Sequence, residues 1–215
     1  MNKKTRNRSC MAGGLLSAFC LWTAIVLVVD VQPIGPLKSC VGLAALNGLV
    51  HRLTGIHMGL YVLTDWLSIV PVGFVLGFAC LGGVQWIKRK RLLAVDRSIL
   101  ILGGFYLAVL TVYLIFEVFV VNYRPVLIEG ILEASYPSST TMLVLCVMLT
   151  AMMQMKARIH HAVFRRYVLL VMSAYTTGMI ALRLVSGVHW LSDIIGGALL
   201  SAGLVIFYSA ACEAE

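Results

Sequence analysis

The stretch RLVSGVHWLSDIIGGALLSAGLVIFYSAAC, residues 183–212, joins a short polar segment to a long apolar one. Its second part, residues 192–212, is long enough to cross the hydrocarbon core of a bilayer, because a spanning helix needs about 20 mostly apolar residues. Stretches of the same kind recur at 11–29, 60–87, 98–121, 139–155 and 167–186. Together they predict an all-α protein, an integral membrane six-helix bundle.

The composition agrees with this fold class. The chain has 215 residues, of which 60% are hydrophobic and 12% charged, and its mean hydropathy is +0.95. These values lie far outside those of soluble globular domains. We find no linker and no internal repeat, so we expect residues 1–215 to form a single six-span membrane domain. The segment 41–57, with apolar residues at helical spacing, is interpreted as a short helix in the membrane interface or as a loop over the bundle.

Basic residues gather in alternate connections, which predicts the orientation of the chain. Thirteen of the seventeen lysines and arginines stand before the first span, after the second and after the fourth. They are Lys3, Lys4, Arg6, Arg8, Lys88, Arg89, Lys90, Arg91, Arg97, Lys156, Arg158, Arg165 and Arg166. By the positive-inside rule, both termini of this multi-pass cell-membrane protein lie in the cytoplasm, and residues 30–59, 122–138 and 187–191 lie outside.

The net charge of +8 is therefore first a signal of topology. Clustered basic residues also suit anionic membrane lipids, whereas the chain has no nucleic-acid-binding module, and no nucleic-acid partner is expected. The six cysteines are scattered without metal-ligand spacing. We therefore predict neither a zinc site nor a disulfide framework.

Three polar side chains interrupt the apolar pattern near the last two spans: Arg183, His189 and Asp193. A charged residue deep in a span costs roughly 2.5–3.5 kcal/mol on insertion scales, so such residues usually face a cavity and serve a function. His189 and Asp193 are four residues apart, which places them on one face if both lie on a helix. Asp193 could then bind one ring nitrogen of His189 and leave the other free as a nucleophile or base.

A second polar group precedes the fourth span, at Pro137-Ser138-Ser139-Thr140. These residues are a good helix start, and the amides of a helix N-terminus can also bind an anion. Arg124, followed by Pro125, could clamp the same anion with its guanidinium group. The predicted topology brings both groups to one side of the membrane, so we expect a phosphate site there.

The three segments resemble the signature motifs of the type 2 phosphatidic acid phosphatase superfamily. Arg-Pro at 124–125, PSST at 137–140 and RLVSGVHWLSD at 183–193 are similar to the family patterns K-x6-R-P, P-S-G-H and S-R-x5-H-x3-D. The resemblance covers residues 98–212, and the third motif is the specific one. It implies a helical bundle with six spans in the membrane members of the family.

The resemblance also implies metal-independent phosphoryl transfer through a phosphohistidine, with no cofactor. His189 matches the nucleophile and Asp193 the carboxylate that orients it. The implied phosphate-binding residues are Arg124, Arg183 and Ser138, and Ser139 and Thr140 stand beside them.

The chain departs from the family patterns at four positions. Glu117 stands in place of the first-motif lysine, Ser139 and Thr140 replace Gly-His, and Leu182 replaces the serine before Arg183. Glu117 reduces the positive charge of the site unless it pairs elsewhere, and it lies two helical turns from Arg124. We therefore expect Glu117 to modulate the site, by an ion pair with Arg124 or Arg183.

Thr140 occupies the place of the acid that protonates the leaving group, and a positioned acid is typically worth 10²–10⁴-fold in rate. His51 and His57 could approach the site from the first outer connection, and His57 is a possible modulator. We interpret both histidines, and Asp65, as interfacial rather than catalytic.

The predicted function is that of a phosphatase acting on lipid phosphates or diphosphates at the extracytoplasmic face. Expelling phosphate from a diphosphate needs less protonation than expelling an alkoxide, so we expect a lipid diphosphate to be preferred. Two alternatives stay open: a degenerate relative that binds or transports a phosphorylated lipid, and a phosphotransferase that uses the same histidine. The expected partners are the phosphorylated lipid and membrane lipids, and the sequence leaves the oligomeric state open.

Overall fold

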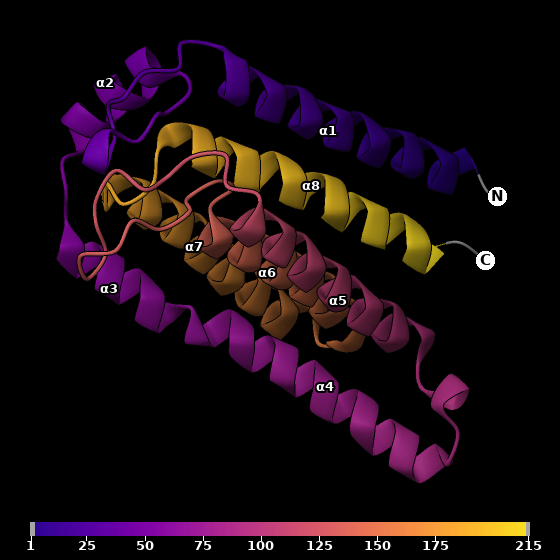
Figure 1. Ribbon diagram of the computed structural model, residues 1–215. Coiled ribbons are helices and arrows are strands. Elements are labelled where there is room, and N and C mark those ends of the chain that lie inside the picture. Colours follow the sequence, from indigo (N-terminus) through magenta and orange to yellow (C-terminus); the bar gives the residue numbers. More distant parts are fainter. Residues whose placement is uncertain (1–2, 214–215) are drawn as a thin grey trace.

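The computed structural model describes residues 3–213 and is a bundle of helices (Figure 1). The long helices are α1 (Lys3–Val28), α4 (Ile69–Arg89), α5 (Arg97–Val118), α6 (Ser139–Arg158), α7 (Ala162–Val185) and α8 (Leu191–Glu213). Two shorter helices are α2 (Ala44–Thr54) and α3 (Met58–Leu67), and single 3₁₀ turns occupy Pro36–Lys38 and Leu92–Ala94. Residues 3–213 contain isolated β-bridges but no strand.

Six helical segments in this part of the chain are long and apolar enough to span a membrane. Each coincides with one of the six stretches predicted from the sequence, and the predicted all-α integral membrane bundle is confirmed. The first helix begins earlier than its apolar stretch, at Lys3, and the third ends earlier, at Val118. Helix ends therefore differ from hydropathy boundaries, because a helix can continue through charged residues beyond the hydrocarbon.

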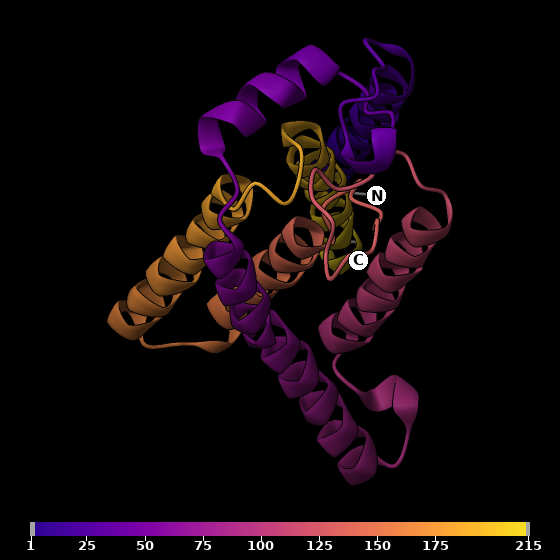
Figure 2. The same cartoon turned by 60° about the vertical axis from the view of Figure 1, so that its left-hand side comes forward.

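The second span is divided at Ser68 into α3 and α4. The backbone N–H of Ser68 donates to the carbonyl oxygens of Thr64 and Asp65, both at 3.1 Å, and its hydroxyl donates to Thr64 O at 2.8 Å. Pro71 follows in the first turn of α4, where its missing N–H costs least. The break lets α3 pack against α7 while α4 runs on beside α6 and α5 (Figures 1 and 2).

The two helices that begin at the second motif and at the end of the third motif, α6 and α8, form the centre of the bundle. In their apolar windows, 56% of α6 and 50% of α8 is buried, against 11–22% in the other spans. Helix α8 packs against α1 on one side and α6 on the other. Small residues allow this approach, since a Cβ atom on Gly203 would lie 2.8 Å from Leu16 of α1.

The three connections between spans that were predicted to lie outside meet at one end of the bundle, here called the connection end. It is formed by α2, residues 122–138 and residues 186–190 (Figure 2). Backbone contacts join these segments: His57 N–H donates to Ser186 O at 2.9 Å, and Gly42 N–H donates to Asn122 Oδ1 at 3.2 Å. The opposite end, the terminal end, holds the Lys4–Glu213 ion pair at 3.0 Å.

Helix α2 lies over the connection end of the bundle (Figure 2). Of the two interpretations of residues 41–57, a short helix or a loop, the structure contains the helix. Leu46, Leu49 and Leu53 on α2 are exposed at 39%, 49% and 78%. This apolar edge suits a helix that rests at a membrane surface.

Gly187 is required where the loop after α7 passes the segment after α2. Its φ is +69°, a left-handed value that favours glycine, and a Cβ atom there would overlap the carbonyl oxygen of Gly55. Gly187→Ala is therefore expected to lower stability by about 1–3 kcal/mol or more, from backbone strain and the clash. Thermal unfolding in detergent measures the effect.

Gly178→Ala in α7 is the matched control, because no atom lies within 4 Å of its added Cβ and alanine is the better helix former. Equal melting temperatures for Gly187→Ala and Gly178→Ala would contradict the close contact of the two loops.

Candidate active site

His189 and Asp193 come together at the start of α8. Because α8 begins at Leu191, His189 belongs to the preceding loop, and the expected arrangement of both residues on one helix is not what forms. The loop nevertheless folds His189 back, so that its Nδ1 lies 3.7 Å from Asp193 Oδ2. Both residues are buried. The separation is longer than a hydrogen bond but short enough for the carboxylate to act on the charge of the ring.

Asp193 is held by several donors in the first turn of α8. Its Oδ2 accepts a hydrogen bond from the backbone N–H of Trp190 at 2.9 Å, which is the geometry of a carboxylate that caps its own helix. Its Oδ1 accepts weaker bonds from Asn122 Nδ2 and Ser192 Oγ, both at 3.4 Å. The carboxylate therefore has a fixed position beside His189.

Two buried asparagines that no motif contains support this turn. Asn47 of α2 accepts from Ser192 N–H at 3.0 Å and donates to Ser192 Oγ at 2.9 Å. Asn122 reaches both Ser192 and Asp193. Sequence reasoning missed both residues, because a single asparagine in a connection carries no spacing signal. Only the folded chain brings them to α8.

Arg183 of α7 lies almost fully buried, at 2% exposure. Its Nη1 donates to Thr64 Oγ1 at 2.9 Å and to Asp65 Oδ1 at 2.8 Å, so both partners come from α3. The ring of Tyr61 stands 4.7 Å from its guanidinium carbon, a cation–π contact. Its Nε atom is buried without a hydrogen-bond partner.

Arg124 approaches the same tyrosine from the connection between α5 and α6. Its guanidinium carbon lies 5.8 Å from the ring centre of Tyr61, and its Nε lies 3.0 Å from Glu133 Oε2. Its Nη1 atom is buried and has no hydrogen-bond partner. The two arginines predicted from separate motifs therefore contact the ring of the same tyrosine.

Glu117 does not form the predicted ion pair with either arginine. It is exposed near the end of α5, and the carboxylates that pair with the arginines are Glu133 and Asp65. The prediction was wrong because helical spacing relates residues on one helix, whereas Arg124 has left α5 and Arg183 faces α3. Asp65, interpreted from sequence as interfacial, is thus a partner of the site.

The residues of the second motif lie at the N-terminus of α6. Ser138 caps the helix, since its Oγ accepts from Thr141 N–H at 3.4 Å and from Thr141 Oγ1 at 3.0 Å. Its own N–H donates to Asp193 O at 3.1 Å, which ties α6 to α8. Ser139 and Thr140 follow in the first turn.

The two outer histidines contact the site only indirectly. His57 is exposed, and its Nε2 lies 2.9 Å from Thr54 O. The ring of His51 packs against the Trp190 ring at 5.3 Å, and burial lowers the pKa of His51. Both therefore border the loop that carries His189 without contacting its ring.

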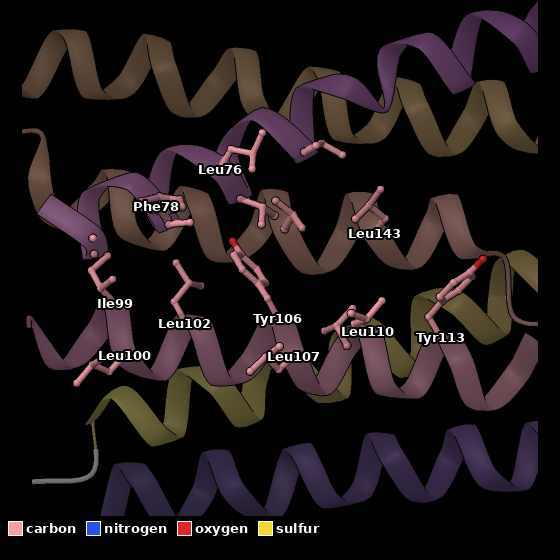
Figure 3. A pocket seen from close by; sticks show the side chains of 18 of the residues that line it. Leu76, Phe78, Ile99, Leu100, Leu102, Tyr106, Leu107, Leu110, Tyr113 and Leu143 are labelled. Carbon is pink, nitrogen blue, oxygen red and sulfur yellow. The ribbon is translucent and has the colours of Figure 1, made fainter. Parts of the chain in front are cut away.

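A long apolar groove of about 1,020 Å³ runs between α4, α5 and α6 (Figure 3). Leucines, phenylalanines and tyrosines line it along its length, among them Leu76, Leu110 and Tyr106. Its polar end, at the connection end of the bundle, is formed by Asp65, Ser68, Ser139 and Thr140. The groove thus leads from the membrane-facing side of the bundle to the residues beside Arg183.

Burial sets the charge of His189. It lowers the pKa of this histidine to about 4, the nearby Asp193 opposes the shift, and the charges of Arg124 and Arg183 add to it. The imidazole is therefore neutral near pH 7, the form that has a free electron pair.

Among residues 3–213, no three His, Cys, Asp or Glu side chains gather as a metal site.

Comparison with known proteins gives a consistent result. Residues 119–214 match the family model of the PAP2 superfamily, and the family resemblance of the three motifs is confirmed. A crystal structure described as the first transmembrane PAP2 type phosphatidylglycerolphosphate phosphatase from Bacillus subtilis is similar in fold. The match has a TM-score of 0.53 and 17% identity and covers 93% of each chain. No curated protein sequence matches significantly.

Proposed function

We propose, on the premise that this chain is a member of the PAP2 superfamily, that it is a membrane-embedded phosphatase of lipid phosphates or diphosphates with His189 as nucleophile. The observation that carries the proposal is a set of buried nitrogen atoms without partners. Arg183 Nε, Arg124 Nη1 and both ring nitrogens of His189 are in this state. Buried charged donors are costly when unpaired, and one phosphate group would supply acceptors to both arginines.

The first chemical step follows from the position of Asp193. Because this carboxylate lies nearest to Nδ1 of His189, it favours a proton on Nδ1 and leaves the electron pair on Nε2. Nε2 attacks the phosphorus atom, the N–P bond forms, and the bond from phosphorus to the leaving oxygen breaks with its electron pair. Arg124 and Arg183 stabilise the charge on the phosphoryl oxygens, and Asp193 stabilises the charged ring.

The apolar groove supports a lipid as the substrate. A headgroup bound by the arginines would sit beside Ser139 and Thr140, where the groove has its polar end. The hydrocarbon chain of the same molecule could then lie between α4, α5 and α6 and stay out of water. His189 itself is only 3% exposed, so the headgroup must move side chains around Tyr61 and Asp65 to reach it.

We place the reaction at the extracytoplasmic face of the cell membrane, with both termini in the cytoplasm. The basic residues near Lys3, Lys88 and Lys156 belong to the terminal end of the bundle, and the proposed site belongs to the connection end. The positive-inside rule assigns the basic end to the cytoplasm. Because α1 packs along α8, we treat residues 1–215 as one functional domain.

The alternative of a lipid-binding relative without activity has less support. Such a protein is expected to block its phosphate site, for example with Glu117 paired across it, and Glu117 is exposed instead. A phosphotransferase would share the same first step and differ in the acceptor.

The substrate preference is a direct test. With Thr140 in place of an acid, a polyprenyl diphosphate is expected to release phosphate at least about 10²-fold faster than phosphatidic acid, because the missing acid is worth 10²–10⁴-fold for a poor leaving group. Phosphate release by detergent-solubilised protein from polyprenyl diphosphate, polyprenyl phosphate and phosphatidic acid measures the order. Faster release from phosphatidic acid would contradict the preference, and release from none of the three by folded protein would contradict the phosphatase.

A further inference from the structure

Hydrolysis through a phosphohistidine needs a second step, and none of the motif residues provides a base for it. Water must lose a proton as it attacks the phosphoryl group on His189. Thr140 stands where the family has a histidine, and a threonine hydroxyl accepts a proton poorly near pH 7. Asp193 is 0% exposed and its oxygens accept from Trp190, Asn122 and Ser192. Another group must therefore accept the proton.

Asp65 is the carboxylate that borders both the arginines and the groove. Its Oδ1 lies 2.8 Å from Arg183 Nη1, and its side chain is 44% exposed while that of Arg183 is 2% exposed. It lines the apolar groove together with Ser139 and Thr140, and it also lines a depression on the outside of α3 with Tyr61 and Glu129. One carboxylate thus pairs with the phosphate-binding arginine, borders the same groove as the second motif and is exposed to the surroundings of the protein.

We propose that Asp65 is the base that activates water for hydrolysis of the phosphohistidine, in place of the histidine that Thr140 replaces. This inference rests on the proposed phosphatase function and adds a catalytic residue from α3, outside the part of the chain that matches the family model, residues 119–214. Arg183 can contact both Asp65 and the phosphate. Its Nη1 donates a hydrogen bond to Asp65 Oδ1, and its unpaired Nε is available to donate to the phosphate.

The step balances without a metal ion or other reactant. Asp65 takes one proton from water, and the water oxygen forms a bond to phosphorus. The bond between phosphorus and Nε2 of His189 breaks, and its electron pair returns to the imidazole, which becomes neutral. Inorganic phosphate leaves, and Asp65 passes its proton to water at the exposed side of α3.

Other carboxylates at the connection end fit this role less well. Glu133 pairs with Arg124 but does not line the groove. Glu117 is exposed and lines a small cavity behind Ser139 instead. Glu129 is exposed in the outer depression and contacts neither arginine. Glu129→Gln is therefore a matched control for the loss of one negative charge near the site.

The test separates formation of the phosphoenzyme from its hydrolysis. Wild type, Asp65→Asn, Asp65→Glu and Glu129→Gln are mixed with polyprenyl diphosphate labelled in the terminal phosphate, then quenched under alkaline conditions that preserve phosphohistidine. For Asp65→Asn we expect steady turnover to fall about 10²-fold or more, while labelled protein accumulates toward one phosphate per chain. Asp65→Glu should restore part of the turnover, and Glu129→Gln should match wild type.

Two outcomes would overturn the role of Asp65. Folded Asp65→Asn that neither turns over nor becomes labelled would show that Asp65 acts only before phosphoryl transfer, by holding Arg183. Asp65→Asn with wild-type turnover would show that no base is needed at this position. Asp65→Ser provides a second neutral variant if Asp65→Asn does not fold. Failure of the proposed function is distinct, because wild type itself would then show neither turnover nor label.

Discussion

Replacing His189 with alanine is expected to abolish phosphate release, with a loss of about 10⁴–10⁶-fold in turnover, the range found when single members of a catalytic triad are removed. The buried ring lies close enough to both arginines for their charges to lower its pKa, and burial keeps it neutral. Neither Asp193 nor Ser138 can replace it, because both are occupied as helix caps. Phosphate release and labelling of the protein by a labelled diphosphate measure the two consequences.

His160→Ala is the matched control for this prediction. His160 is exposed in the connection between α6 and α7, at the terminal end of the bundle, and its loss should leave turnover unchanged. Since neither ring nitrogen of His189 has a hydrogen-bond partner, His189→Ala should fold and melt near the wild-type temperature. Turnover by folded His189→Ala above one hundredth of wild type would rule out the phosphohistidine route.

Replacing Arg183 with alanine is expected to lower kcat/KM by about 10²–10³-fold, the effect of removing one donor that stabilises a transition-state anion. Arg183→Lys should recover only part of this loss. A lysine keeps the charge but has a single nitrogen, which cannot hold Asp65 with one group and offer another to the phosphate. Steady-state kinetics with polyprenyl diphosphate measures both variants.

Stability separates this effect from simple unfolding. Breaking a fully buried ion pair costs about 3–5 kcal/mol, but Asp65 is 44% exposed, so the carboxylate left behind can be solvated. We therefore expect Arg183→Ala to lose much less stability than that and to remain folded. Arg52→Ala, an exposed arginine on α2 at the same end, is the control. Arg183→Ala with a wild-type kcat/KM would remove Arg183 from the site.

The motifs predicted which residues lie close together more accurately than they predicted which structural elements hold those residues. His189 and Asp193 lie close together. His189 belongs to the loop before α8 and Asp193 to the first turn of α8, so the two residues are not on one helix. Arg124 and Arg183 share the ring of Tyr61, a residue that no motif contains. Motif spacing reflects the residues that a family needs at its reaction centre. It gives no information on the other residues that contact them in a particular chain.

The partners of the arginines illustrate what spacing leaves out. Glu117, seven residues before Arg124, was expected to hold an arginine, whereas Asp65 and Glu133 do so. Asp65 is more than one hundred residues away from Arg183 in sequence. An ion pair of this kind depends on which helix faces which, and periodicity within a helix does not contain that information.

The sequence by itself determined the six spans and the helix start at residues 137–140, because each depends on local composition and on hydrogen bonds to near neighbours. Only the tertiary structure decided that α3 brings Asp65 to Arg183, that Asn47 and Asn122 support the start of α8, and that an apolar groove ends at Thr140. The physical reason is the distance along the chain between the groups that interact. Burial of an apolar helix in lipid needs no partner in the protein, whereas buried polar groups must find theirs across the fold.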